Sequence, residues 1–175
     1  MDVVPQEMEE TLDAVPNVEM VISLGRATAS EARDIWRVTR IAYAPYKGII
    51  KPTFGALRVT EKAIRYQIRT GKYIYLVARH EGRVVGTLRC RKRGRYLGLS
   101  RLAVLPDYQR HGIGRRLMEW AEDEARRLGL RRLRGEVRAV MPDLLRYYRR
   151  MGYRPIGRRS RKGYPGYLII VQKRL

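Results

Sequence analysis

The spacing of hydrophobic residues along the chain alternates between the period of a helix and that of a strand. Apolar side chains recur every three or four positions in four segments, which predicts helices over residues 30–43, 60–71, 112–128 and 142–152. Ser30 is a suitable N-terminal cap for the first helix, and Pro142 suits the first turn of the fourth. The third helix is the most regular, and Gly129 follows it as a stop.

Short apolar runs bounded by turn residues predict the strands. These runs cover residues 20–24, 73–80, 84–93, 97–105, 133–140, 153–158 and 167–173. Glu81-Gly82 predicts a tight hairpin between the second and third runs. The order β-α-α-β-β-β-α-β-α-β-β contains no internal repeat, and it predicts an α/β domain around one mixed sheet.

The length of the chain limits it to one domain. With 175 residues and 45% hydrophobic composition, it has room for one sizeable core but not for two ordinary domains. We therefore predict a domain over residues 19–175, preceded by a polar, acidic and mobile arm over residues 1–18. No apolar run is long enough to span a membrane, and the acidic N-terminus is unlike a signal peptide. Together with a single cysteine, these features favour a cytoplasmic protein.

The formal net charge of +21 is unevenly distributed. Residues 1–19 hold six of the 17 acidic residues and none of the 38 basic ones, so the rest of the chain carries +27. Such a surface attracts polyanions, including nucleic acids and phosphate-rich cofactors. The excess is nearly all arginine, however, which a genomic coding bias or adaptation to heat explains equally well. A basic nucleic-acid-binding module therefore stays open as an alternative function.

The strongest chemical signal lies where the strand ending at Leu105 runs through a Pro-Asp turn into the third helix. The sequence there, QRHGIGR over Gln109–Arg115, places two glycines at a helix N-terminus. Unpaired backbone amides and the positive end of the helix dipole meet at such a point and attract anions. Gly112 and Gly114 leave room for a diphosphate to approach the backbone, although the same glycines also fit a tight turn with close helix packing.

This stretch closely resembles a known family. The run Gln-x-x-Gly-x-Gly at Gln109–Gly114, preceded by Leu102-Ala103-Val104 and Pro106, is similar to the coenzyme A signature of the GCN5-related N-acetyltransferases (GNAT). The later LLRYYRRMGY at Leu144–Tyr153 resembles that family's tyrosine-bearing helix with its terminal Gly-aromatic pair. The predicted strand order matches the family fold from Met20 to Lys173. The resemblance implies a single domain whose central mixed sheet is flanked by helices and splayed at the cofactor site.

The resemblance also implies a reaction and a donor-binding site. The expected reaction transfers an acetyl group from acetyl-CoA to a primary amine by direct attack, without a metal ion. The backbone of Leu102, Ala103 and Val104 is expected to pair with the pantetheine arm like an additional strand. The residues expected to hold the pyrophosphate are Gln109, Arg110, His111, Gly112, Ile113, Gly114 and Arg115.

Two residues are expected to act in proton transfer. Tyr148 lies four residues before Gly152, where the family places the tyrosine that protonates the departing thiolate; the alternative is an aromatic residue that only lines the cleft. Glu136 lies twelve residues before Tyr148, which is similar to the placement of the base in the ribosomal-protein N-terminal acetyltransferase branch. A carboxylate among apolar neighbours has a raised pKa suited to a base. The alternative is a solvated or arginine-paired glutamate.

The sequence departs from the family pattern at two positions. The strand over residues 97–105 has Ser100 and Arg101 where some members carry a carboxylate, and Met141 stands where members often have an asparagine that contacts the cofactor. A Cys/His hydrolase is disfavoured, because Cys90 lies far along the predicted hairpin from His80. Cys90 is instead predicted to be a buried small hydrophobe.

The acceptor amine is the least constrained part of the prediction. By analogy with the fold, it enters between residues 42–52 and the last hairpin over residues 158–167, where Tyr43, Tyr46 and Tyr164 are available to line a cleft or to pack the loops. The basic hairpin repels polycations and favours small or anionic amines over polyamines. Homodimers are common in the family, but no segment of the sequence identifies an interface.

Overall fold

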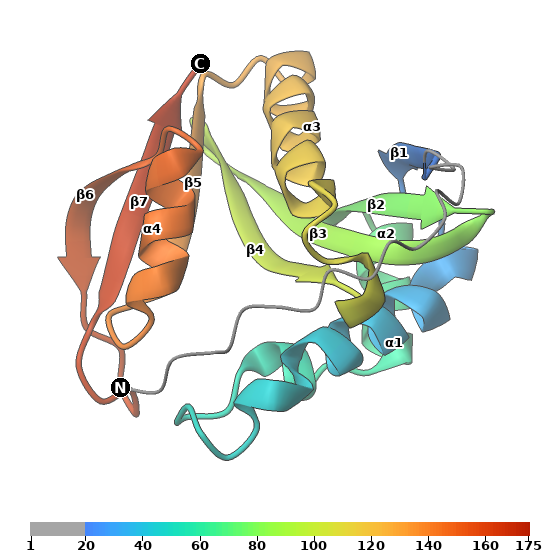
Figure 1. The fold of residues 1–175 in the computed structure, drawn as a ribbon. Coiled ribbons are helices and arrows are strands. Elements are labelled where there is room, and N and C mark those ends of the chain that lie inside the picture. The colour runs from blue at the N-terminus through green and yellow to red at the C-terminus, as the bar shows by residue number, and fades with distance from the viewer. Residues whose placement is uncertain (1–19) are drawn as a thin grey trace, which may run out of the picture.

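The computed structural model describes residues 20–175, and the predicted acidic arm over residues 1–18 lies outside these described residues (Figure 1). The strands are β1 (Ile22–Arg26), β2 (Ile74–His80), β3 (Arg83–Arg93), β4 (Tyr96–Val104), β5 (Arg132–Arg138), β6 (Arg154–Arg159) and β7 (Leu168–Arg174). The helices are α1 (Ala32–Tyr43), α2 (Glu61–Arg69), α3 (Ile113–Arg127) and α4 (Pro142–Arg150).

All seven strands form one mixed sheet in the order β1-β2-β3-β4-β5-β7-β6. Every neighbouring pair is antiparallel except β4 and β5, which are parallel. Helices α1 and α2 pack on one side of the β1–β4 half, α3 packs on the other, and α4 lies over β5 and β7 (Figure 1). The predicted α/β architecture and the order of its elements are confirmed.

The start of α1 differs from the prediction. Thr28, rather than Ser30, caps a turn of 3-10 helix over Ala29–Glu31, and α1 follows directly after this turn. The reason is local, because Glu31 lies three residues after Thr28 and its carboxylate accepts a hydrogen bond from the Thr28 backbone N–H at 2.8 Å. The helix therefore begins after this reciprocal cap.

The sheet splits between β4 and β5. The two strands pair only at Leu97↔Leu133 and Gly98↔Arg134, and then they diverge (Figure 1). On its other side, β4 stays paired with β3 up to Val104, with an irregularity in register between Thr87 and Arg89. From Leu99 onward, the β4 edge that faces β5 therefore has no strand partner. The splayed sheet expected from the sequence is present.

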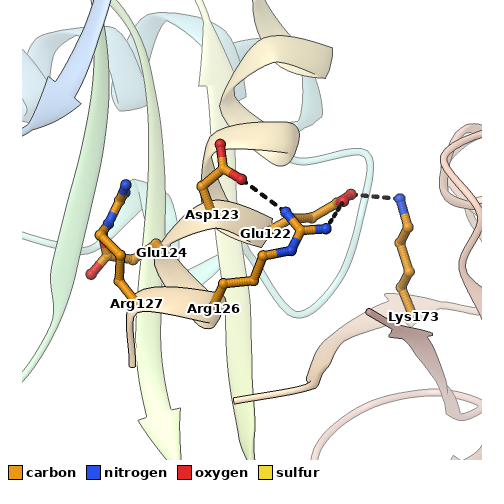
Figure 2. Close-up of polar contacts among 6 residues, drawn as sticks. All are labelled: Glu122, Asp123, Glu124, Arg126, Arg127 and Lys173. Carbon is orange, nitrogen blue, oxygen red and sulfur yellow. Dashed lines mark hydrogen bonds and ion pairs between the residues drawn. The ribbon is translucent and has the colours of Figure 1, made fainter. Parts of the chain in front are cut away.

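Two buried carboxylates attach α3 to both halves of the split sheet. Figure 2 shows Glu122 and Glu124 pointing to opposite sides of the helix. Glu122 accepts a hydrogen bond of 2.6 Å from Lys173 on β7, whereas the fully buried Glu124 pairs with Arg26 on β1 and with Arg127. Burial opposes ionisation of Glu124, but the hydrogen bonds from these arginines outweigh it and lower the pKa of that carboxyl.

We expect Glu124→Gln to lower the free energy of unfolding by about 2 kcal/mol near neutral pH, because it removes a buried, doubly bonded charge. Because the folded-state pKa of Glu124 is depressed, its contribution is complete above the unfolded-state pKa and is lost as pH falls through the folded-state value. The difference between the two proteins should therefore shrink in acid. Urea denaturation at several pH values measures it.

Asp123→Asn is the matched control, since Asp123 lies on the same helix but its pair with Arg126 is more than half exposed. Its effect should stay within about 0.5 kcal/mol at every pH. Equal losses for the two substitutions would contradict an anchoring role for Glu124.

Within residues 20–175, no helix has both the length and the apolar content needed to cross a membrane.

Candidate functional site

The unpaired edge of β4 presents backbone hydrogen-bonding groups to the split. The Leu105 N–H donates to the Val85 carbonyl on β3 at 2.9 Å. Since backbone groups alternate in direction along a strand, the polar groups of Val104 and Leu102 point the other way, toward the open edge. Ala103 faces β3, with which it pairs opposite Thr87. The predicted segment Leu102–Val104 thus has the geometry needed to accept one more extended chain.

The loop after β4 leads directly to the N-terminus of α3. A 3-10 turn over Pro106–Tyr108 is followed by Arg110 and Gly112 with φ of +63° and +73°. Gly112 caps α3 in this left-handed conformation, which glycine adopts without strain. Gln109 Nε2 donates to the Val104 carbonyl at 3.0 Å, and this contact secures the loop to the end of the strand. The first-turn amides of α3 have no partners within the helix, and the positive end of the helix dipole lies here.

The arginines of this loop differ in the contacts that they make. Arg115 pairs with Glu119 at 2.9 Å, and Arg116 donates to the Ile22 carbonyl on β1 at 2.9 Å. Arg110 is exposed and forms no ion pair within residues 20–175. His111, also exposed, shares a hydrogen bond of 2.8 Å with the Gln109 carbonyl. Of these arginines, Arg110 is therefore the one most available to an approaching phosphate.

Gly114 is important because it has no side chain at a point where neighbouring groups come close. Its φ is not in the left-handed region. A Cβ at this position would lie 3.2 Å from the Tyr147 hydroxyl and 3.7 Å from Leu102 Cδ2. The Tyr147 hydroxyl is buried and has no hydrogen-bond partner within the described residues. Tyr147 therefore brings a free polar group from α4 to the start of α3. Sequence reasoning missed it because the adjacent Tyr148 matched the family pattern, although two consecutive tyrosines on one helix were a visible signal.

Tyr148 is buried near the split and packs on β5. Its hydroxyl lies 3.1 Å from the position that a Cβ would take at Gly135, so β5 accepts this ring only because residue 135 is glycine. The rings of Tyr147 and Tyr153 lie edge-on to it at 6.2 and 5.3 Å. Burial, with a smaller contribution from Tyr43, raises the pKa of Tyr148, which keeps the phenol protonated at neutral pH. A protonated phenol suits the predicted role as an acid.

Glu136 does not have the apolar surroundings expected for it. Side chains alternate along β5, so Glu136 points to the sheet face opposite Gly135 and Tyr148. Its side chain is 41% exposed, and its two oxygens accept hydrogen bonds of 2.6 and 2.8 Å from Arg159 on β6. The arginine that pairs with Glu136 thus lies on β6, whereas Arg134 and Arg138, which are close to Glu136 in sequence, lie on β5. The role of Glu136 as a base stays a prediction.

Beyond the split, a group of aromatic and arginine side chains joins the segment after α1 to the β6–β7 loop. The Phe54 ring packs edge-on against Tyr43 at 5.3 Å. Arg138 lies between the rings of Phe54 and Tyr164, at 4.1 and 4.7 Å, and donates to the Pro52 carbonyl at 2.5 Å. The two segments expected from the sequence to flank the acceptor are therefore brought together.

Cys90 and the histidines lie outside this arrangement. Cys90 is buried opposite Ile74, at the far end of the β2–β3 pair from His80, which confirms their predicted separation. Burial raises the pKa of the Cys90 thiol, which makes it a poor nucleophile. Met141 is half-buried and packs against the core instead of offering a polar contact. Residues 20–175 contain no group of three or more His, Cys, Asp or Glu side chains that could hold a metal ion.

Comparison with known proteins agrees with this geometry. The sequence model of the acetyltransferase (GNAT) family matches residues 37–153. An IAA acetyltransferase of Azospirillum brasilense is 38% identical over 81 residues, which cover 45% of this chain and 53% of that protein. The chain thus spans about half the length of this curated relative.

Solved structures share the fold at low sequence identity. The PaiA N-acetyltransferase of Thermoplasma acidophilum in complex with coenzyme A has a TM-score of 0.75 and 17% identity, covering 89% of this chain and 100% of that one. The ribosomal-protein-S18-alanine N-acetyltransferase of Escherichia coli has a TM-score of 0.68 and 20% identity, with coverage of 87% and 92%. The yncA protein of Salmonella typhimurium with its cofactor acetyl-CoA has a TM-score of 0.69 and 19% identity, with coverage of 88% and 94%.

Proposed function

This chain belongs to the acetyltransferase (GNAT) family, and from that premise we propose that it transfers an acetyl group from acetyl-CoA to a primary amine by direct attack. The observation that carries the proposal is the continuity of the open β4 edge with the α3 N-terminus. An extended amide-bearing arm fits the edge, and a diphosphate fits the amides that follow it. Relatives solved with coenzyme A or acetyl-CoA support the same donor.

The residues of this chain suit the donor at each end of the split. Leu102 and Val104 offer backbone groups to the pantetheine arm, and Arg110 with the first-turn amides of α3 offers positive charge to the pyrophosphate. The unpartnered Tyr147 hydroxyl lies between these two regions and offers one more donor to a polar group of the bound molecule. These assignments are part of the proposal.

The donor supplies an activated thioester, whose acyl carbon the amine attacks and whose sulfur leaves as a thiolate. We assign the Tyr148 hydroxyl as the acid that donates to this sulfur, because it stays protonated at neutral pH and lies near the split. We assign Glu136 as the group that receives the proton released from the attacking amine, directly or through water. The new C–N bond and the broken C–S bond then leave an amide and a free thiol.

A thermal-shift titration with acetyl-CoA and longer acyl-CoAs, followed by thiol release against a panel of amines, tests the proposal. Saturable stabilisation by acetyl-CoA and thiol release with at least one amine are expected. The nucleic-acid alternative predicts instead DNA or RNA binding that falls steeply with salt, with no saturable affinity for acetyl-CoA. Neither the family match nor the relatives named above support that alternative.

Replacing Glu136 with glutamine should lower turnover most near neutral pH, with a deficit that shrinks as pH rises. If the carboxylate takes a proton from an ammonium substrate, higher pH supplies the neutral amine from solution and makes the base dispensable. Turnover of wild type and Glu136→Gln across the pH range, at saturating acetyl-CoA, measures this effect.

Arg159→Gln serves as the comparison, because it breaks the same ion pair but keeps the Glu136 carboxylate. It should leave most of the neutral-pH turnover in place. Equal, pH-independent losses in both variants would show that the pair only supports the structure.

A further inference from the structure

Arg101 occupies an unusual place on β4. It lies where β4 and β3 lose register, and its φ is +56°, a left-handed conformation that non-glycine residues adopt at a cost. This bulge falls in the part of β4 that β5 has left unpaired. The irregularity therefore redirects a charged side chain at the split, next to the edge assigned to the donor.

The Arg101 side chain is partly buried, and one nitrogen of its guanidinium is shielded from solvent. Its Nη1 is buried and has no hydrogen-bond partner within the described residues, and its Nη2 lies 3.5 Å from where a Cβ would sit at Gly55. Burial and the nearby Arg89 lower the pKa of Arg101, and the Tyr75 and Tyr43 hydroxyls partly oppose this shift. A buried guanidinium nitrogen without a hydrogen-bond partner is costly, and a ligand carboxylate that bonds to it would remove that cost.

Among residues 20–175, no carboxylate forms an ion pair with Arg101. The segments around it, residues 42–57, 84–93, 96–104 and 158–167, contain no Asp or Glu. Arg89, Arg101 and Arg138 are absent from the ion pairs formed within residues 20–175, and Glu136 on the neighbouring strand is held by Arg159. Arg138 is buried and adds a further positive charge, fixed between the rings of Phe54 and Tyr164.

Arg101 and the predicted acid belong to the two strands that border the split. Arg101 lies on the stretch of β4 that has no strand partner, and the Tyr148 hydroxyl lies against Gly135 on β5. An acceptor bound to Arg101 is therefore held at the split. Because this placement requires an acyl donor on β4, it rests on the proposed function.

We propose that the acceptor is a small amine that also carries a carboxylate, and that Arg101 binds this carboxylate. The planar guanidinium matches the two oxygens of a carboxylate, and the Tyr43, Phe54 and Tyr164 rings supply an apolar wall for the body of the molecule. Arg138 acts as a positioning residue, because it donates to the Pro52 carbonyl and to the Tyr164 hydroxyl and so holds these two residues in place. The amine is thereby left free to face the acyl carbon.

The first experiment uses the full chain without substitutions. Thiol release from acetyl-CoA is measured with the twenty L-amino acids, β-alanine and 4-aminobutyrate, and each α-amino acid is compared with its carboxamide. For at least one acid, kcat/KM should be higher than for its amide by about tenfold or more. The same acid, but not its amide, should raise the melting temperature of the chain in the presence of coenzyme A. 2-Aminoethyl phosphate tests whether the site recognises a phosphate instead of a carboxylate. A higher kcat/KM for this compound than for every acid would overturn the proposal.

The second experiment removes the guanidinium. Arg101→Gln should raise the KM for the preferred acid about 30-fold, the effect of losing a hydrogen-bonded charge, while the KM for acetyl-CoA stays unchanged. The preference for acid over amide should fall to within about threefold. Arg101→Lys keeps the charge and should restore part of the preference. Arg154→Gln, an exposed arginine at the start of β6, is the matched control and should change neither value.

The outcomes separate this inference from the proposed function. Saturable binding of acetyl-CoA together with equal use of acids and amides would contradict the proposal that Arg101 binds a carboxylate. It would leave the proposed acetyltransferase function unaffected. Absence of both acetyl-CoA binding and thiol release would overturn the transferase itself. Should Arg101→Gln fail to fold, the wild-type acid and amide comparison and Arg101→Lys still decide the question.

Discussion

Glutamate in place of Gly112 is expected to abolish acetyl-CoA binding while the chain stays folded. Gly112 is exposed, and a Cβ there would meet no atom within 4 Å, so the side chain has room. Its φ of +73° makes any other residue strained by about 1–2 kcal/mol, which a folded domain of this size tolerates. The new carboxylate would occupy the α3 N-terminus. One like charge at about 4 Å costs ~4 kcal/mol at an effective dielectric of 20, so Kd should rise by about 10³-fold.

Gly129→Glu provides a closely matched control. Gly129 follows the other end of α3, has a φ of +70° and also has open space at its Cβ position. The substitution introduces the same charge and similar strain far from the proposed phosphate site. Acetyl-CoA affinity, measured by calorimetry or thermal shift, should stay near the wild-type value in this variant. Unchanged acetyl-CoA affinity in a folded Gly112→Glu protein would contradict the assignment of residues 109–115 to the pyrophosphate site.

Phenylalanine in place of Tyr148 should lower turnover by about 10²-fold with little change in acetyl-CoA affinity or stability. The substitution keeps the ring that packs against Gly135 and Tyr153 and removes only the hydroxyl. Removing the hydroxyl affects only the step in which the thiolate leaves. The expected decrease in turnover is no larger because a thiolate is a fair leaving group even without an acid. Because the pKa of Tyr148 is raised, the deficit should be the same throughout the neutral range.

Tyr153→Phe is the control for removing a buried hydroxyl in the same cluster. The Tyr153 ring lies 5.3 Å from that of Tyr148, and its hydroxyl has no hydrogen-bond partner within the described residues. Turnover should therefore stay near the wild-type value. Affinity and turnover are to be measured on one preparation, with whichever amine the panel identifies. Near-wild-type turnover in Tyr148→Phe would remove Tyr148 as the acid, whereas a matching loss of affinity would make it a binding residue.

The order of elements was predictable because each one carries a local signal. The α3 segment has one apolar face and a glycine stop, and Glu81-Gly82 forms the expected turn with positive φ at both residues. Predicted boundaries therefore fall close to the observed ones. The glycine-containing loop at Gln109–Gly114 was equally visible, because its residue types and spacing reflect local backbone geometry.

The surroundings of the site were not predictable from these local signals. A one-residue bulge leaves no mark in the hydrophobic pattern of β4, so the redirection of Arg101 was hidden. Glu136 pairs with Arg159, 23 positions away, and Arg138 reaches Pro52, 86 positions away. Such contacts depend on how β6 and the segment after α1 pack against β5. The prediction for Glu136 considered its neighbours in sequence, whereas its neighbours in space determine its exposure.

The unpaired stretch of β4 also links the stability of this protein to its ligands. Any molecule that binds the folded edge, and not the unfolded chain, stabilises the fold by RT ln(1 + [L]/Kd), about 2.7 kcal/mol at a hundredfold excess over Kd. That amount is a substantial fraction of the stability of a typical domain. Since β4 and β5 share only two residue pairs, a bound chain would also join the halves of the sheet. The free concentration of the donor would then regulate the lifetime of the protein as well as its rate of catalysis.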